Sequence, residues 1–305
     1  MATAATRIRT LSPTGFLRLA VASCVALFLV VTSGAFVRLT GSGLGCENWP
    51  RCGDKPYPEQ GFHAFVEFGN RLIALVGIVL TLVTWLAARR VDGLPRVARF
   101  AALGAFLVAA AQIPLGGITI ALDLHPLAVM AHFLLGLAVL GLTVIVVIEA
   151  WAYDDGLAAP AGPRRLRQAV TWGGVPLCVA LVVTGAVATA SGPHPGANED
   201  VKRLGLEIAD AVYAHVRVAT VFGIGALVVG WFLWRVRGAY PGLVRLWSLL
   251  FAALVAQAIL GEVQYRSALP WGLVLVHVFL AATIWALSLA LAYALWRPPA
   301  RLTRQ

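Results

Sequence analysis

The chain has 305 residues, of which 60% are apolar and only 12% charged, and its mean hydropathy is +0.82. This composition excludes an ordinary soluble domain, in which about 25% of the residues are charged. The formal net charge is +10, but the basic residues gather between apolar segments, so we interpret the charge as a topology signal and expect no nucleic-acid partner.

Eight apolar runs follow one another along the chain, and each is long enough to cross about 30 Å of hydrocarbon. They cover residues 16–37, 63–88, 100–121, 127–150, 169–190, 211–234, 246–264 and 272–296. Because a backbone in lipid must satisfy its own hydrogen bonds, each run is predicted to be a helix. The first run follows basic residues, as a signal peptide would, but it is too long for one and is expected to span the membrane. The predicted fold class is an all-α integral membrane protein with eight transmembrane helices.

The basic residues predict the orientation of these helices. Sixteen of the 24 Lys and Arg fall in the tails 1–15 and 297–305, the linker 151–168, and alternate connections or their flanking helix ends. The positive-inside rule makes these segments cytoplasmic, with both chain ends inside. The outer connections are then about 38–62, 122–126, 191–210 and 265–271, and all six histidines lie on or just beneath that outer face.

A repeat relates the two halves of the chain. The segment that begins at Ala111 aligns without a gap on the segment that begins at Ala256, so that Gln112 and His132 recur as Gln257 and His277, 145 residues later. Each half starts inside and has four helices. We therefore predict two parallel-repeat four-helix bundles, 16–150 and 169–296, related by an axis along the membrane normal.

Histidines inside a bilayer are rare and usually functional. A lone one often serves only as a hydrogen-bonding residue between helices. His215 and His277, however, are expected at the same depth on facing helices, which favours axial ligation of a haem iron. Gln112 and Gln257 are expected to join helices. His125 and His194, in outer connections, are expected to be exposed or gating residues.

The repeat places Asn70 where the second half has His215. Around it, His63, Glu67, Asn70 and Arg71 share one helix face at spacings of i, i+4, i+7 and i+8. A buried carboxylate is costly in a membrane, so Glu67 is expected to be catalytic or to handle protons. Three further arginines lie at outer helix ends and are candidate partners for haem propionates, namely Arg38, Arg217 and Arg266.

Two cysteines, Cys46 and Cys52, lie together in the first outer loop, GLGCENWPRC. Outside the membrane a disulfide can persist, so we expect the pair to be bonded. The bond is either a local staple or a redox-active pair that meets a thiol carrier.

Together these features resemble the haem A synthase family over essentially the whole chain. The resemblance lies in SGAFVRLTGSGLGCENWPRC (33–52), HAFVEFGNR (63–71), QIPLGG with the later His132, TGAVATASGPHPG (184–196), His215, and QYRSALPWGLVLVH ending at His277. It implies oxidation of the C8 methyl of haem O to a formyl group. It also implies a haem B cofactor on His215 and His277, with substrate haem near His132 and Glu67. A haem O synthase is the implied partner, and the electron donor and a homo-oligomer are left open.

The chain departs from the family at Asn70, where many members have histidine. Asparagine is a poor iron ligand, so we expect the substrate iron to be five-coordinate on His132. The alternative sixth ligand is His63, about 10 Å shallower at 1.5 Å per residue. Asn70 and Arg71 are expected to support the substrate site from close by.

Two other functions compete with this interpretation. A b-type electron-transfer cytochrome would explain the histidines but needs a second well-ligated haem in the first half, where Asn70 and Glu67 lie. A thiol–disulfide oxidoreductase would explain Cys46 and Cys52 but leaves the histidines unused. A transporter would place charge at the midplane, and here the charges lie near the outer face.

Overall fold

The computed structural model describes residues 11–55, 57–59, 61–156 and 161–303, and the regular structure in these ranges is helical. The long helices are α1 (Pro13–Leu39), α2 (Phe62–Ala88), α3 (Arg96–Ala121), α4 (Pro126–Asp154), α6 (Val175–Ser191), α7 (Ile208–Arg235), α8 (Pro241–Arg266) and α9 (Trp271–Trp296). The short α5 (Arg164–Ala169) continues into α6 through a π-helical segment, Val170–Gly174, and a 3₁₀ turn, Ala300–Leu302, follows α9.

Eight helical segments of the described chain are long and apolar enough to cross a membrane, as predicted. Each predicted run lies inside one of them, and α5 and α6 together form the fifth. The helices extend past the apolar runs, because capping residues and prolines, and not hydropathy, determine where a helix begins and ends. The Ser12 hydroxyl, for example, accepts a hydrogen bond from the Gly15 N–H at 3.1 Å, and Pro13 occupies the first turn of α1.

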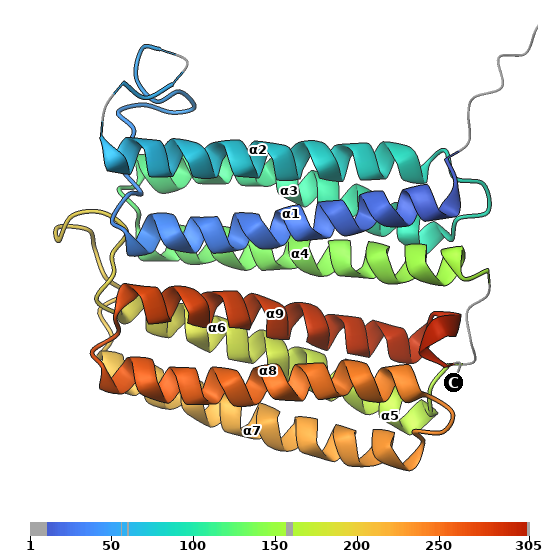
Figure 1. The fold of residues 1–305 in the computed structure, drawn as a ribbon. Coiled ribbons are helices and arrows are strands. Elements are labelled where there is room, and N and C mark those ends of the chain that lie inside the picture. Colours follow the sequence, from blue (N-terminus) through green and yellow to red (C-terminus); the bar gives the residue numbers. More distant parts are fainter. Residues whose placement is uncertain (1–10, 56, 60, 157–160, 304–305) are drawn as a thin grey trace, which may run out of the picture.

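The helices pack as two groups, α1–α4 and α6–α9, with α4 and α9 side by side at the boundary (Figure 1). The first turn of α1 and the last turn of α9 lie at the same end of the molecule (Figure 1). We call this the cytoplasmic end and the opposite one the outer end, following the predicted topology.

Two outer turns share an uncommon backbone conformation. Asp123 and Leu124, between α3 and α4, have φ of 48° and 56°, and Ala268 and Leu269, between α8 and α9, have φ of 60° and 58°. Non-glycine residues rarely adopt positive φ. The two pairs lie 145 residues apart, the spacing of the sequence repeat. That the groups are repeats of one another stays a prediction, and these turns support it.

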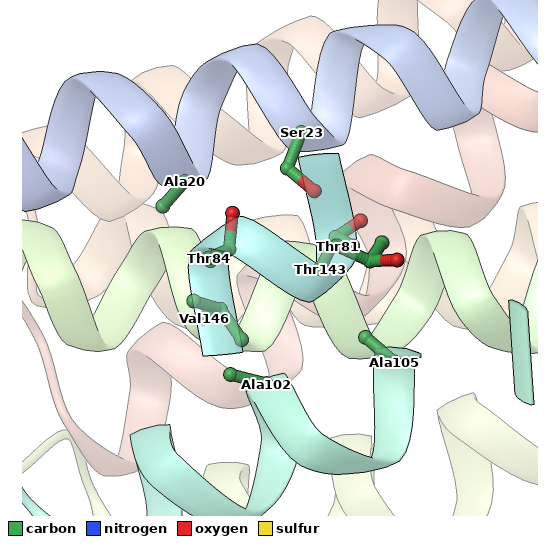
Figure 2. A pocket seen from close by; sticks show the side chains of 8 residues that line it. All are labelled: Ala20, Ser23, Thr81, Thr84, Ala102, Ala105, Thr143 and Val146. Atoms are coloured by element: carbon green, nitrogen blue, oxygen red, sulfur yellow. The ribbon is translucent and has the colours of Figure 1, made fainter. Parts of the chain in front are cut away.

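Small and hydroxyl-bearing side chains fill the interior of the first group. Figure 2 shows Ser23 of α1, Thr84 of α2, Ala102 of α3 and Thr143 of α4 gathered where the four helices meet, with no room for a water molecule between them. The Thr84 and Thr143 hydroxyls donate to carbonyls of their own helices. Such residues let transmembrane helices approach closely where lipid provides no hydrophobic driving force.

Polar contacts join the two groups at both ends. At the outer end, the Gly43 N–H donates to the Gly196 carbonyl at 2.7 Å. At the cytoplasmic end, the Glu149 carboxylate of α4 accepts from the Tyr293 hydroxyl at 2.6 Å and pairs with Arg297. These contacts fix the position of α4 against α9, and hence the relative placement of the histidines that these helices carry.

Candidate haem-binding site

His215 on α7 faces His277 on α9. Their ring centroids are 6.4 Å apart and their planes are inclined by 65°. An imidazole nitrogen bonds a metal at about 2.0–2.1 Å, and the ring centroid lies roughly 1 Å behind that nitrogen, so two rings on opposite faces of one metal have centroids about 6 Å apart. The observed separation therefore fits two axial ligands of one haem iron.

The side chain of His215 is oriented by α6. The Thr184 hydroxyl lies 3.1 Å from the Nδ1 atom of His215, within hydrogen-bonding distance. The next residue, Gly185, allows the close approach, because a Cβ there would lie 3.1 Å from the Cε1 atom of the same ring. A hydrogen bond at Nδ1 orients the ring and leaves Nε2 free for a metal.

His132 and His277 have the same partner in their respective groups. The Gln112 amide donates to the His132 carbonyl at 3.0 Å, and the Gln257 amide donates to the His277 carbonyl at 3.0 Å. These bonds confirm that both glutamines join helices. The Nδ1 atoms of both histidines are buried, and the structure gives them no hydrogen-bond partner.

Asn70 occupies the setting in the first group that His215 has in the second. Ser33 of α1 donates its hydroxyl to the Asn70 Oδ1 at 2.7 Å, as Thr184 of α6 lies beside the His215 ring. In both cases a glycine follows the hydroxyl residue, Gly34 in the first group. The amide is shorter than an imidazole and is a poor metal ligand. The first group thus offers one imidazole, His132, where the second offers two.

Glu67 lies beneath the first outer loop and is only 5% exposed. Its Oε1 accepts from the Arg71 guanidinium at 2.5 Å, and its Oε2 accepts from the Cys46 N–H at 2.8 Å. The same guanidinium donates to the carbonyls of Asn48, Pro50 and Arg51. Glu67 and Arg71 therefore hold the loop on α2. Among the described residues, no hydrogen bond or ion pair joins Glu67 to His132.

The cysteine loop, residues 46–52, is closed by the predicted disulfide, with an S–S distance of 2.03 Å between Cys46 and Cys52. Its Trp49 packs on α3, where a Cβ at Gly117 would lie 3.2 Å from the indole ring. The loop thus covers the outer ends of α2 and α3.

The other histidines make contacts of their own. His63 is exposed, and its Nδ1 lies 2.9 Å from the Ser42 hydroxyl. His125 precedes the first turn of α4 and caps no backbone group with its side chain. The Nε2 atom of His194 lies 2.8 Å from the Leu269 carbonyl, which ties the outer connection 192–207 to the turn before α9.

The three candidate propionate partners differ in their contacts. Arg38 donates to the carbonyls of Thr189 and His194 at 2.9 and 3.0 Å and so links α1 to the second group. Arg217 lies over the ring of Tyr213 and donates to its hydroxyl. Arg266 pairs with Glu262, and its side chain is 77% exposed.

A family model described as COX15-CtaA, cytochrome oxidase assembly protein, matches residues 17–62 and 58–289. The chain belongs to this family. The match covers both groups of helices, the cysteine loop and all the histidines.

Several curated proteins named Heme A synthase are similar to this family member. The chain is 27% identical to the protein of Bacillus pumilus over 173 residues, covering 55% of the chain and 56% of that protein. The protein of Shouchella clausii is 29% identical over 144 residues, 46% of the chain and 47% of that protein. That of Lysinibacillus sphaericus is 36% identical over 115 residues, 35% and 38% respectively. The chain thus matches roughly half or less of the length of these relatives.

Some contacts at the candidate site of this COX15-CtaA chain could not be assigned from sequence. Ser33-Gly34-Ala35 and Thr184-Gly185-Ala186 are similar motifs in the two halves, but the contacts of Ser33 with Asn70 and of Thr184 with His215 depend on how α1 and α6 are rotated. The signal was present, since a hydroxyl residue precedes glycine in both motifs.

Proposed function

We propose that the chain is a haem A synthase, which oxidises the C8 methyl of haem O to a formyl group. Membership of the COX15-CtaA family and the name of the curated relatives support this activity. The observation that carries it is the facing pair His215 and His277, whose ring centroids are 6.4 Å apart in the second group of helices. At the corresponding positions the first group has one imidazole, His132, and the amide of Asn70.

The resident cofactor in this proposal is haem B, and His215 and His277 would hold its iron. When bound, haem B supplies one-electron redox chemistry that side chains cannot provide. Thr184 orients one of the two imidazoles. Arg38, Arg217 and Arg266 are proposed partners of the propionates, and the first of them is already fixed by two carbonyls.

The substrate haem is proposed to lie in the first group, with its iron on His132. Asn70 opposite leaves one face of that iron without a strong protein ligand, and His63 is the alternative ligand. Glu67 is the proposed catalytic residue, which would transfer a proton or stabilise positive charge that develops at the methyl carbon. Arg71 positions this carboxylate, and the cysteine loop excludes water from above it.

The orientation in the membrane is part of the proposal. Both ends of the chain are placed in the cytoplasm, because the basic residues gather at the end where α1 starts and α9 finishes. The two haem sites then lie toward the outer face. A haem O synthase that delivers the substrate and an unidentified electron donor are the proposed partners, and a homo-oligomer is left open.

The cofactor assignment is tested by removing the ligands. His215→Ala or His277→Ala should abolish the low-spin haem B spectrum of the purified protein while the chain still inserts into the membrane. His125→Ala is the matched control and should keep the spectrum, because that histidine lies before α4. A normal spectrum in both ligand variants would refute the assignment.

The activity is tested by supplying haem O. Membranes that make haem O but no haem A should accumulate haem A when the chain is expressed, as measured by haem extraction and chromatography. Haem B alone, at two per chain, would instead identify a b-type cytochrome.

A further inference from the structure

A cavity of about 690 Å³ opens at the outer end of the second group. It is lined by the end of α6 and the following connection (Gly192, Pro193), by the first residue of α7 (Ile208), and by the end of α8 (Tyr265) with its turn. The sites described above do not use this cavity.

Among the described residues that line this cavity, Arg203 is the charged one. Its Nη1 donates to the Gly192 carbonyl at 2.5 Å and its Nη2 to the Pro193 carbonyl at 2.9 Å, so the guanidinium is fixed at the cavity wall. A guanidinium has five N–H donors, and these two bonds leave three for a ligand. The phenol of Tyr265 lines the same cavity. A guanidinium and a phenol hydroxyl that line one cavity are both able to donate to a carboxylate.

The cavity lies at the outer end of α7, which carries His215, and beside the turn that leads into α9, which carries His277. His215 follows Ile208 by seven residues, which is about 10 Å along α7 at 1.5 Å per residue. His277 follows the first residue of α9 by six residues, about 9 Å. A porphyrin held by both imidazoles would therefore have its outward edge toward this cavity, and its propionates are carboxylates on flexible arms.

We propose that Arg203, assisted by Tyr265, binds a propionate of the haem held by His215 and His277. This inference rests on the haem B site of the proposed function and adds a binding residue to it. The guanidinium offers fixed donors, in contrast to Arg266, which is paired with Glu262 and largely exposed. A soluble carboxylate is the other source of the same chemistry, and the experiment separates the two.

The test measures the midpoint potential of haem B in the purified chain. Arg203→Gln should lower the potential, because removing a cation disfavours the more negative ferrous haem, and Arg203→Lys should lower it less. Lys202→Gln is the matched control: it removes the same charge from an exposed neighbour outside the cavity and should shift the potential less than either variant.

A second arm replaces the propionates. After reconstitution with haem B dimethyl ester, Arg203→Gln should shift the potential less than it does with haem B, because the ester has no carboxylate to hold the guanidinium against the haem and only the through-space effect of the charge remains. A shift of the same size with the ester, or a wild-type potential that responds to added acetate through Arg203, would overturn the proposal. So would an unchanged potential in Arg203→Gln with haem bound. Absence of haem from the wild type would overturn the proposed function as well.

Discussion

At the scale of single residues, one observed role and one proposed role compete for the Glu67 carboxylate. Its oxygens accept hydrogen bonds from Arg71 and from the Cys46 N–H, which anchors the cysteine loop. As the proposed catalytic residue, the same group would act on the substrate methyl. The two roles make different predictions for substitutions at Glu67 and at its partner Arg71.

Glu67→Gln should reduce haem A formation by about 100-fold or more, the range for loss of a positioned proton-transferring group. The chain should still fold and keep haem B, because His215 and His277 lie in the other group of helices. Haem A is measured by extraction, and haem B by its absorption spectrum.

Arg71→Gln is the matched variant, since it breaks the ion pair but keeps the carboxylate. If Glu67 is catalytic, Arg71→Gln should retain much more activity than Glu67→Gln. Equal losses in the two variants would show that anchoring of the loop is the whole function of the pair.

The setting of Asn70 predicts what a histidine there would do. Ser33 and Gly34 surround Asn70 as Thr184 and Gly185 surround His215, so the position can orient an imidazole. Asn70→His should convert bound haem O from high-spin to low-spin by adding a second axial ligand. Asn70→Ala, the control, should leave it high-spin. Optical and electron paramagnetic resonance spectra distinguish these states, and a high-spin spectrum in Asn70→His would contradict the prediction.

At the scale of elements, the positions of the helices could be predicted from the sequence, but most of the side-chain contacts between them could not. The eight spans followed from apolar length, because lipid constrains both the length and the hydrogen bonding of a helix. The facing of His215 and His277 followed from their equal depth. The anchoring of the cysteine loop by Arg71 did not follow, because the loop is irregular and its carbonyls carry no side-chain signal. The contact of Ser33 with Asn70 could not be predicted either, because it depends on how α1 is rotated about its axis. The sequence of an evenly apolar helix does not determine that rotation.

The cysteine loop predicts a limited effect of losing its disulfide. The ring spans a sequence separation of 6, and closing so short a ring contributes about 2 kcal/mol in the chain-entropy model. Glu67 and Arg71 hold the loop independently of the sulfur atoms. Replacing Cys46 and Cys52 by serine should therefore leave haem B binding intact and lower haem A formation only in part.

Added thiols distinguish the two interpretations of the pair. A loss that no reductant restores indicates a structural staple, whereas wild-type activity that depends on a thiol donor, and is lost in the double variant, indicates a redox role. Unchanged activity under every condition would refute both.

At the scale of the whole molecule, the two groups of helices are joined by polar contacts at opposite ends. Arg38 and Gly43 reach the second group at the outer end, and Glu149 pairs with Arg297 at the cytoplasmic end. Between them, the Trp285 indole donates to the Leu137 carbonyl across the boundary between α4 and α9. Because His132 is on α4 and His277 on α9, these contacts determine how the two proposed haem sites lie relative to each other.

The cytoplasmic contact predicts a specific loss of stability. The Glu149 side chain is 0% exposed, and that of Arg297 is 40% exposed. Arg297→Gln leaves the buried carboxylate with the Tyr293 hydroxyl alone, which should destabilise the protein by roughly 2–3 kcal/mol, below the 3–5 of fully buried pairs because Arg297 is partly solvated. Lys55→Gln is the matched control. It breaks the pair with Glu59, in which the two side chains are 56% and 57% exposed, and it should change stability by less than about 1 kcal/mol.

The measurement is the thermal loss of the haem B spectrum in detergent, compared among the single variants and the double variant Glu149→Gln/Arg297→Gln. The double variant should be more stable than Arg297→Gln, because it no longer leaves an unpaired charge in the interior. If Arg297→Gln proves as mild as Lys55→Gln, the pair does not hold the two groups together, and the outer contacts, the Trp285 hydrogen bond and the apolar packing of α4 on α9 must do so.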